Sequence, residues 1–76
     1  MNNSRRKRIY DSLADLNMSK DKLELALYEE RQALDRLSDD EEYDNMRDGM
    51  EEIISGLEDT LTNLEDAINT LEGAYF

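Results

Sequence analysis

The chain has 76 residues and a formal net charge of −11 at pH 7, from 20 acidic against 9 basic side chains. It contains no cysteine, histidine, proline or tryptophan. Without cysteine and histidine it lacks disulfides and the commonest catalytic bases, nucleophiles and soft metal ligands, so we expect neither an enzyme nor a bound metal or cofactor. The length allows a single domain, residues 1–76, with a thin core.

The first predicted element is a helix over about residues 5–37, because apolar residues recur there at alternating spacings of four and three. Only two charged residues interrupt this seam. Its members are Ile9, Leu13, Leu16, Lys20, Leu23, Leu27, Glu30, Leu34 and Leu37. Small residues also flank the seam at intervals of seven, as is typical of closely packed antiparallel helices. They are Ser12, Ser19, Ala26 and Ala33.

An acidic turn is predicted over about residues 38–43. The seam repeats every seven residues as far as Leu37, but the next seam residue is Tyr43, which is one residue too early for the same register. Ser38 and Glu41 have the spacing of a capping box, with Ser38 as the N-cap of a second helix. The alternative is one bent helix of about 70 residues, roughly 100 Å long. We favour the hairpin.

The second predicted helix covers about residues 44–72 and contains four heptads. Each heptad begins with an apolar residue followed by glutamate, and a second apolar residue comes four positions after the first. The starting residues are Met50, Leu57, Leu64 and Leu71, and the later ones are Ile54, Leu61, Ile68 and Tyr75. Thr60, Ala67 and Ala74 form a small flank that matches the one on the first helix. Gly73 is expected to end the helix and leave a short aromatic tail at 73–76.

These elements predict an all-α fold, an antiparallel two-helix hairpin resembling a coiled coil. One such interface is thin for a chain without disulfides or metals, so we expect a homo-oligomeric helical bundle, most simply a twofold dimer with four helices. The predicted oligomer seam is Leu16, Lys20, Leu23, Leu27, Glu30 and Leu34. Lys20 of one copy can meet Glu30 of another if their first helices pack antiparallel about Leu25. Alternatively, both charged side chains reach out to water.

Two surfaces are candidates for binding. The basic cluster Arg5, Arg6, Lys7 and Arg8, with Tyr10 and Lys20, can hold a phosphate, a nucleotide or an acidic surface. Alternatively, this cluster only neutralises the acidic end of the second helix. The acidic face of the second helix consists of Glu51, Glu58, Asp59, Glu65, Asp66 and Glu72. Such carboxylates can imitate a phosphate backbone, and they can equally form an ordinary solvated surface.

Four segments follow one another in a series along the chain: the opening SRRKRI, the leucine helix with KLELALYEERQALD, the acidic turn, and MEEIISGLEDTLTNLEDAINTLE. This series, which covers nearly the whole chain, resembles short acidic helical-hairpin proteins of phages and prophages of Gram-positive bacteria. Members often carry a Pro-Glu-rich turn and a Ser-Glu-Arg segment, where this chain has LSDDEEYDNMRDG. The resemblance implies a phage-encoded accessory protein, and such proteins often block a host factor or sequester a nucleotide signal.

Three alternative functions are therefore consistent with the sequence, and the first is favoured. The first is a non-catalytic oligomer that binds and inhibits or sequesters a host factor, such as a component of antiviral defence. The second is a nucleotide second-messenger sponge, with the ligand held between protomers by the basic cluster. The third is a structural scaffold. We expect a cytoplasmic location, in the host cytosol if the chain is phage-encoded, no direct membrane contact, and no nucleic-acid binding except through mimicry.

Overall fold

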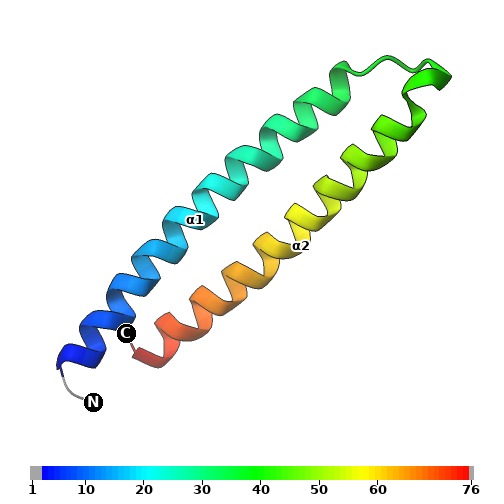
Figure 1. Ribbon diagram of the computed structural model, residues 1–76. Coiled ribbons are helices and arrows are strands. Elements are labelled where there is room, and N and C mark those ends of the chain that lie inside the picture. Colours follow the sequence, from blue (N-terminus) through cyan, green and yellow to red (C-terminus); the bar gives the residue numbers. More distant parts are fainter. Residues whose placement is uncertain (1–2, 76) are drawn as a thin grey trace.

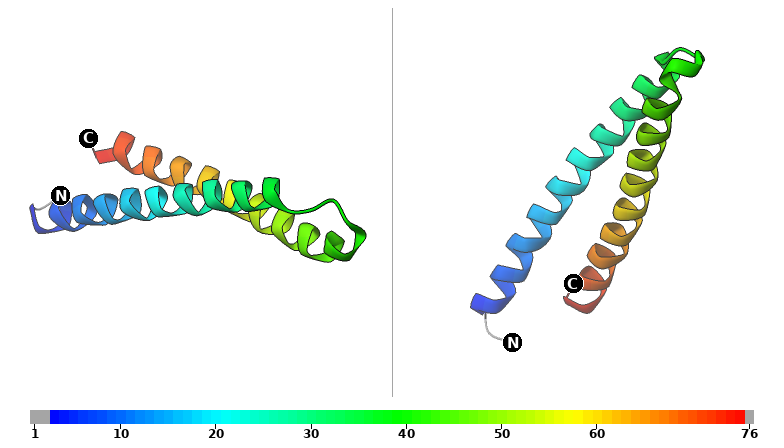
Figure 2. Two further views of the ribbon diagram at one scale, coloured as in Figure 1. Left: turned by 90° about the horizontal axis from the view of Figure 1, so that it is seen from above. Right: turned by 45° about the vertical axis from the view of Figure 1, so that its right-hand side comes forward.

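The computed structural model describes residues 3–75, and the side chains of residues 3–74. Two long helices, α1 (Asn3–Arg36) and α2 (Asp44–Tyr75), are joined by a turn that contains the short 3-10 helix η1 (Glu41–Tyr43). The helices run antiparallel, so that the start of α1 lies beside the end of α2 (Figures 1 and 2). The hairpin measures 60 × 15 × 13 Å. This confirms the predicted all-α hairpin and excludes a single bent helix.

The core of the hairpin is the predicted seam between α1 and α2. Four seam residues are buried: Leu13, Leu27, Leu61 and Ile68 are 6%, 8%, 7% and 4% exposed. The other described residues of both predicted seams are half-buried. Within residues 3–74 no side chain is fully enclosed, because two helices alone cannot surround a residue from every direction. The core is therefore a single line of contacts.

The end of α2 differs from the prediction at Gly73. The helix continues through Gly73 to Tyr75, and no described glycine has a positive φ. The prediction that Gly73 ends the helix is therefore wrong. Glycine permits the left-handed conformation that ends many helices but does not require it, and Ala74 favours continued helix. Of the predicted aromatic tail, Phe76 and the side chain of Tyr75 lie outside the described residues.

The helix α2 begins at residue 44, as predicted, but the cap before it differs from the prediction. The Ser38 hydroxyl accepts a hydrogen bond from the Asp40 backbone N–H over 3.3 Å. The chain then passes through Asp40, which is extended (φ −60°, ψ 142°), into η1, and α2 begins only at Asp44. The predicted capping box of Ser38 and Glu41 is therefore wrong, because the reversal of the chain needs an extended residue between them. The acidic residues that follow still complement the positive end of the helix dipole.

Arg47 fixes the geometry of this turn. Its side chain is 23% exposed, and its guanidinium donates hydrogen bonds to the Ser38 carbonyl oxygen and, over 2.8 Å, to Asp44 Oδ1. The Asp39 carboxylate lies 3.9 Å from the same guanidinium. The Arg47 side chain thus links the residues that follow α1 to the first turn of α2. No motif in the sequence predicted this contact.

Replacing Arg47 by alanine is expected to lower the free energy of unfolding by about 2 kcal/mol, because charge-assisted hydrogen bonds at the turn are lost. Urea unfolding followed by circular dichroism measures the change. Arg8→Ala is the matched control, since Arg8 is exposed and makes no ion pair within the described residues. Equal losses in the two variants would show that the Arg47 contacts do not hold the turn.

Candidate interaction surfaces

The two sides of the groove between α1 and α2 carry different residues. On the first, here called the acidic side, α1 has Tyr10, Asn17, Glu24 and Arg31, and α2 has Glu51, Glu58, Glu65 and Glu72, each set seven residues apart. Arg31 and Glu58 form an ion pair over 3.5 Å, which shows that these two columns face each other across the groove. Both side chains are about half exposed, so the pair contributes little stability.

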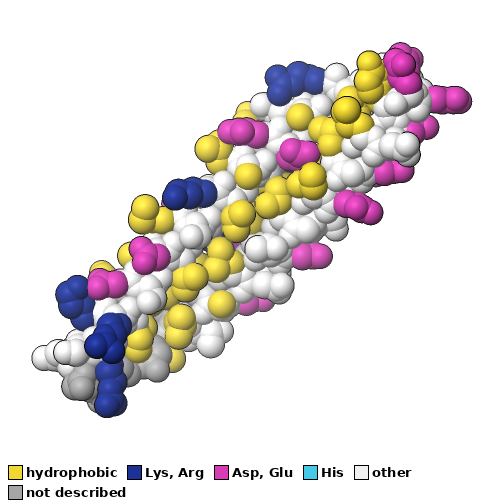
Figure 3. All heavy atoms as spheres, in the orientation of Figure 1, with side chains coloured by type: hydrophobic (Ala, Val, Ile, Leu, Met, Phe, Trp, Pro, Cys, Tyr) yellow, Lys and Arg dark blue, Asp and Glu magenta, His cyan; other side chains and the backbone are white. Residues whose placement is uncertain are grey.

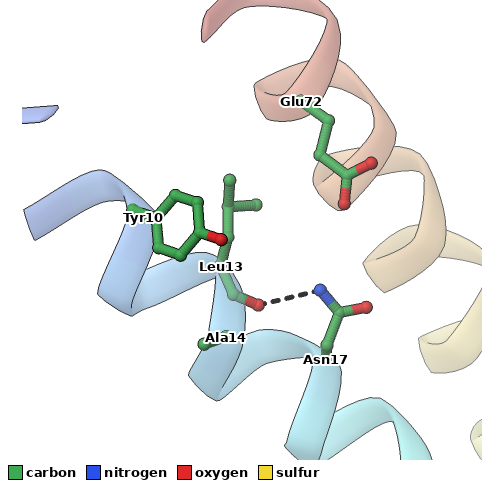
Figure 4. A pocket seen from close by; sticks show the side chains of 5 residues that line it. All are labelled: Tyr10, Leu13, Ala14, Asn17 and Glu72. Carbon is green, nitrogen blue, oxygen red and sulfur yellow. Dashed lines mark hydrogen bonds between the residues drawn. The ribbon is translucent and has the colours of Figure 1, made fainter. Parts of the chain in front are cut away.

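A shallow hollow lies on the acidic side near the end of α2. Its volume is about 210 Å³, and Tyr10, Leu13, Ala14, Asn17 and Glu72 line it. The Glu72 carboxylate and the Asn17 amide both reach into this space, and the amide donates a hydrogen bond to the Leu13 carbonyl oxygen over 3.0 Å (Figure 4). Pockets for small ligands usually exceed roughly 300 Å³. This hollow is therefore small for a nucleotide.

The predicted basic cluster does not converge on one point. Arg5, Arg6, Lys7 and Arg8 are all exposed, and consecutive helical residues are about 100° apart, so the four side chains leave α1 in different directions. Lys20 lies in the seam, roughly 18 Å further along the helix than Arg8. Tyr10 borders the hollow described above. The structure therefore does not bring these candidate ligand-binding residues together within one chain.

Three cations of the cluster make no direct contact with carboxylates of α2 within residues 3–74. Lys7 Nζ lies 2.8 Å from Asp11 Oδ2, and this hydrogen bond raises the pKa of Lys7 above its usual value. Arg6 and Arg8 make no ion pair among the described residues. Arg6, Lys7 and Arg8 therefore form no ion pair with the acidic end of α2 in the described part of the chain, and neutralisation by the cluster as a whole stays a prediction.

The acidic face is an open surface. All six of its residues are exposed, and within residues 3–74 only Glu58 pairs with a cation. No group of three or more metal-ligating side chains in the described part of the chain is close enough to hold a metal ion. The predicted oligomer seam faces α2 within the chain, with Leu27 buried and the other five residues half-buried. Pairing of Lys20 with Glu30 between copies stays a prediction.

A surface that was not predicted as a whole lies on α1 and extends from Tyr10, on the acidic side, to the side away from α2. Tyr10, Met18, Leu25 and Tyr28 are 62%, 58%, 57% and 58% exposed. At about 100° per residue, these four side chains fall within an arc of roughly 80°. We call this line of residues the outer face of α1. Its residues recur with the helical period, as those of the seam do, and this second apolar period was the signal in the sequence. Tyr10 borders the acidic side, whereas Met18 and Leu25 lie opposite the seam.

The other side of the groove, here called the uncharged side, contains the small flanks of the two predicted seams. In α1 it consists of Ser12, Ser19, Ala26 and Ala33, and in α2 of Met46, Ile53, Thr60, Ala67 and Ala74. Met46 and Ile53 are 56% and 53% exposed, and Ala33 alone is half-buried. The flanks are therefore not buried between α1 and α2. Figure 3 shows a band of hydrophobic side chains along the groove, with acidic side chains mainly at the margins.

Within residues 3–75, neither helix is long and apolar enough to cross a membrane. Comparison of the chain with protein-family models, with curated proteins and with solved structures found no match.

Proposed function

We propose that the chain is a non-catalytic binding protein that docks onto a partner protein through the outer face of α1. The observation that carries this proposal is the line of four large apolar side chains, Tyr10, Met18, Leu25 and Tyr28, each more than half exposed. Scattered exposed apolar residues are ordinary on protein surfaces, but these four lie within one arc of roughly 80° along a single helix. Tyrosine and methionine are also enriched in protein interfaces.

The chemistry of this face indicates what the partner offers. An amphipathic helix with anchors at helical spacing fits into an apolar groove of another protein. Asp21 and Asp35 lie on the same face as the anchors, and the chain as a whole carries a net charge of −11. A groove with basic residues at its rim is therefore the complementary surface, because opposite charges speed association and orient the two proteins.

A partner protein agrees better with the geometry than a nucleotide does. The cations of the basic cluster diverge, and the hollow beside Tyr10 has a volume of only about 210 Å³. Following the resemblance to small phage proteins, we propose that the partner is a host factor that the chain inhibits or sequesters. Binding alone accounts for either effect, because occupying a groove denies it to other proteins.

Leu25→Glu is the variant that tests this function. Affinity purification from lysate of a Gram-positive bacterium, quantified by mass spectrometry, is carried out with the wild type, Leu25→Glu and Ile53→Glu as baits. We expect the wild type and Ile53→Glu to retain a common protein. The amount that Leu25→Glu retains should be lower by about tenfold or more, since a charge in an interface anchor is costly. Leu25 and Ile53 are 57% and 53% exposed, so both variants should fold alike.

Identical sets of proteins on all three baits would contradict docking through the outer face. A thermal-shift assay of the purified chain with a panel of nucleotides addresses the sponge function separately. A ligand that binds only the folded chain raises its melting temperature. A shift with one nucleotide that disappears in Arg6→Ala would favour the sponge over the protein-binding function.

A further inference from the structure

We infer that the uncharged side of the groove binds a second copy of this chain, with α2 antiparallel to α2 of the second copy and α1 antiparallel to its α1. This contact uses a different surface from the outer face of α1 and does not depend on the proposed function. Three independent features of the uncharged side point to it.

The first feature is the distribution of charge. Two copies with a net charge of −11 each repel one another, so a stable contact has to keep their carboxylates apart. The glutamates of α2 that repeat every seven residues lie on the acidic side. The next column of repeated carboxylates lies further round the helix and also faces away from the uncharged side. The uncharged side of α2 and the column next to it contain no charged residue. That neighbouring column consists of Gly49, Gly56, Asn63 and Thr70.

The second feature is the order of large and small side chains along α2. Met46 and Ile53 stand in the first half of the helix, and Ala67 and Ala74 stand in the second half. An antiparallel α2 related by a twofold axis at Thr60 places Met46 over Ala74 of the second copy and Ile53 over its Ala67. Large side chains then fill the space above small ones, as close packing between helices requires.

The glycines of α2 agree with a close approach on this side. A Cβ atom added at Gly49 or Gly56 would meet nothing within 4 Å, and neither residue has a positive φ. The hairpin itself therefore does not require glycine at these positions, where glycine weakens the helix. Both residues adjoin the column of Met46 and Ile53, where they leave room for a neighbouring backbone.

The third feature is an alternation of charge along α1. Asp15, Lys22, Glu29 and Arg36 follow one another at intervals of seven, beside the uncharged side. An antiparallel α1 centred between residues 25 and 26 brings Asp15 to Arg36 of the second copy and Lys22 to its Glu29. All four side chains are exposed, and none forms an ion pair within the described chain. The same register also brings Lys20 near the level of Glu30 of the second copy.

The centres of the α1 contact and the α2 contact lie at a similar level along the hairpin, and the surface is large enough for a stable interface. Arg31 and Glu58 lie at one level, since they form an ion pair, and counting along the helices puts residues 25–26 within about one turn of Thr60. One twofold axis can therefore relate both helices. The hairpin is 60 Å long and 15 Å wide, so this side offers about 900 Å², similar to the roughly 800 Å² per partner of a stable interface.

Sedimentation equilibrium of the full chain tests the contact. The wild type is expected at twice its mass of 8.9 kDa, and Ile53→Glu at the single mass. Met18→Glu is the matched control, because it adds the same charge at a residue that is 58% exposed on the outer face, and it should remain a dimer. Circular dichroism verifies that both variants keep their helices. A monomeric wild type, or a dimer unaffected by Ile53→Glu, would overturn the inference.

The register has its own tests. Lys22→Glu should weaken the dimer by about tenfold or more, and adding Glu29→Lys should restore it, since opposite charges then meet again. Equal dissociation constants of the single and double variants would overturn the register. The chain has no cysteine, so an introduced one is unique. Thr60→Cys lies on the proposed axis and should form a disulfide dimer, whereas Ser55→Cys, on another side of α2, should not. Equal cross-linking of the two would also contradict it.

These experiments separate the dimer from the proposed function. Ile53→Glu should lose the dimer and keep the partner protein, and Leu25→Glu should lose the partner and keep the dimer. Each of the two proposals can therefore fail while the other holds.

Discussion

Replacing Ile68 by alanine is expected to lower the free energy of unfolding by about 3 kcal/mol, because its side chain is 4% exposed and its loss leaves a cavity in the seam. For a chain of this length, such a loss lowers the melting temperature by roughly 12–24 °C. Few other contacts can compensate, since only four side chains of the described chain are buried. Urea and thermal unfolding followed by circular dichroism measure the change.

Ile53→Ala provides the matched control for this prediction. It removes the same atoms from the same helix, but Ile53 is 53% exposed, so the hairpin itself should lose well under about 1 kcal/mol. The comparison is made at low chain concentration, where self-association contributes least. Similar losses in the two variants would mean that the line of contacts between α1 and α2 is not the core.

The second large effect is expected from Lys20→Leu combined with Glu30→Leu. Both residues are half-buried among leucines of the seam, and neither forms an ion pair within the described chain. Leucine at both positions makes the seam continuous, and we expect a gain of about 2 kcal/mol in the free energy of unfolding. The melting temperature should rise by roughly 10 °C. A lower melting temperature would show that the charged side chains contribute more to stability than their apolar replacements.

The sequence was sufficient to predict the helical hairpin and its core. Spacings of four and three residues predicted the seams, and every described residue of those seams is buried or half-buried. The step from Leu37 to Tyr43 is six residues, one fewer than the repeat of seven, and it located the turn correctly. These predictions succeeded because helical periodicity is a local property, and burial of an apolar stripe against a neighbouring helix follows directly from it.

The caps of α2 were not predictable in the same way, although its start at residue 44 was. Ser38 and Glu41 have the spacing of a capping box, but an extended Asp40 lies between them. Arg47 reaches back to the Ser38 carbonyl oxygen, a contact between residues nine apart that no local pattern reveals. Gly73 can end a helix and here does not. Each of these outcomes depends on how the chain reverses or continues in three dimensions.

The candidate surfaces were only partly predictable. Arg5 to Arg8 looked like one binding site because they are adjacent in sequence, but adjacent residues of a helix point in different directions. Met18, Leu25 and Tyr28 were overlooked because the predictions rested on a single apolar period along α1, and Tyr10 was predicted only as part of the basic cluster. The structure shows that this helix has apolar residues on two opposite sides, whereas those of α2 lie along the seam and the adjoining uncharged side. The second apolar side of α1 is the reason for proposing a partner.

A second copy on the uncharged side is claimed to stabilise the hairpin further, since the core of one hairpin is thin although a single chain can form it. The most direct test is the melting temperature of the wild-type chain, measured by circular dichroism over a wide range of chain concentration. If folded hairpins associate and unfolded chains do not, the melting temperature rises as the concentration increases, by mass action. A melting temperature that stays constant over the whole range would contradict the claim.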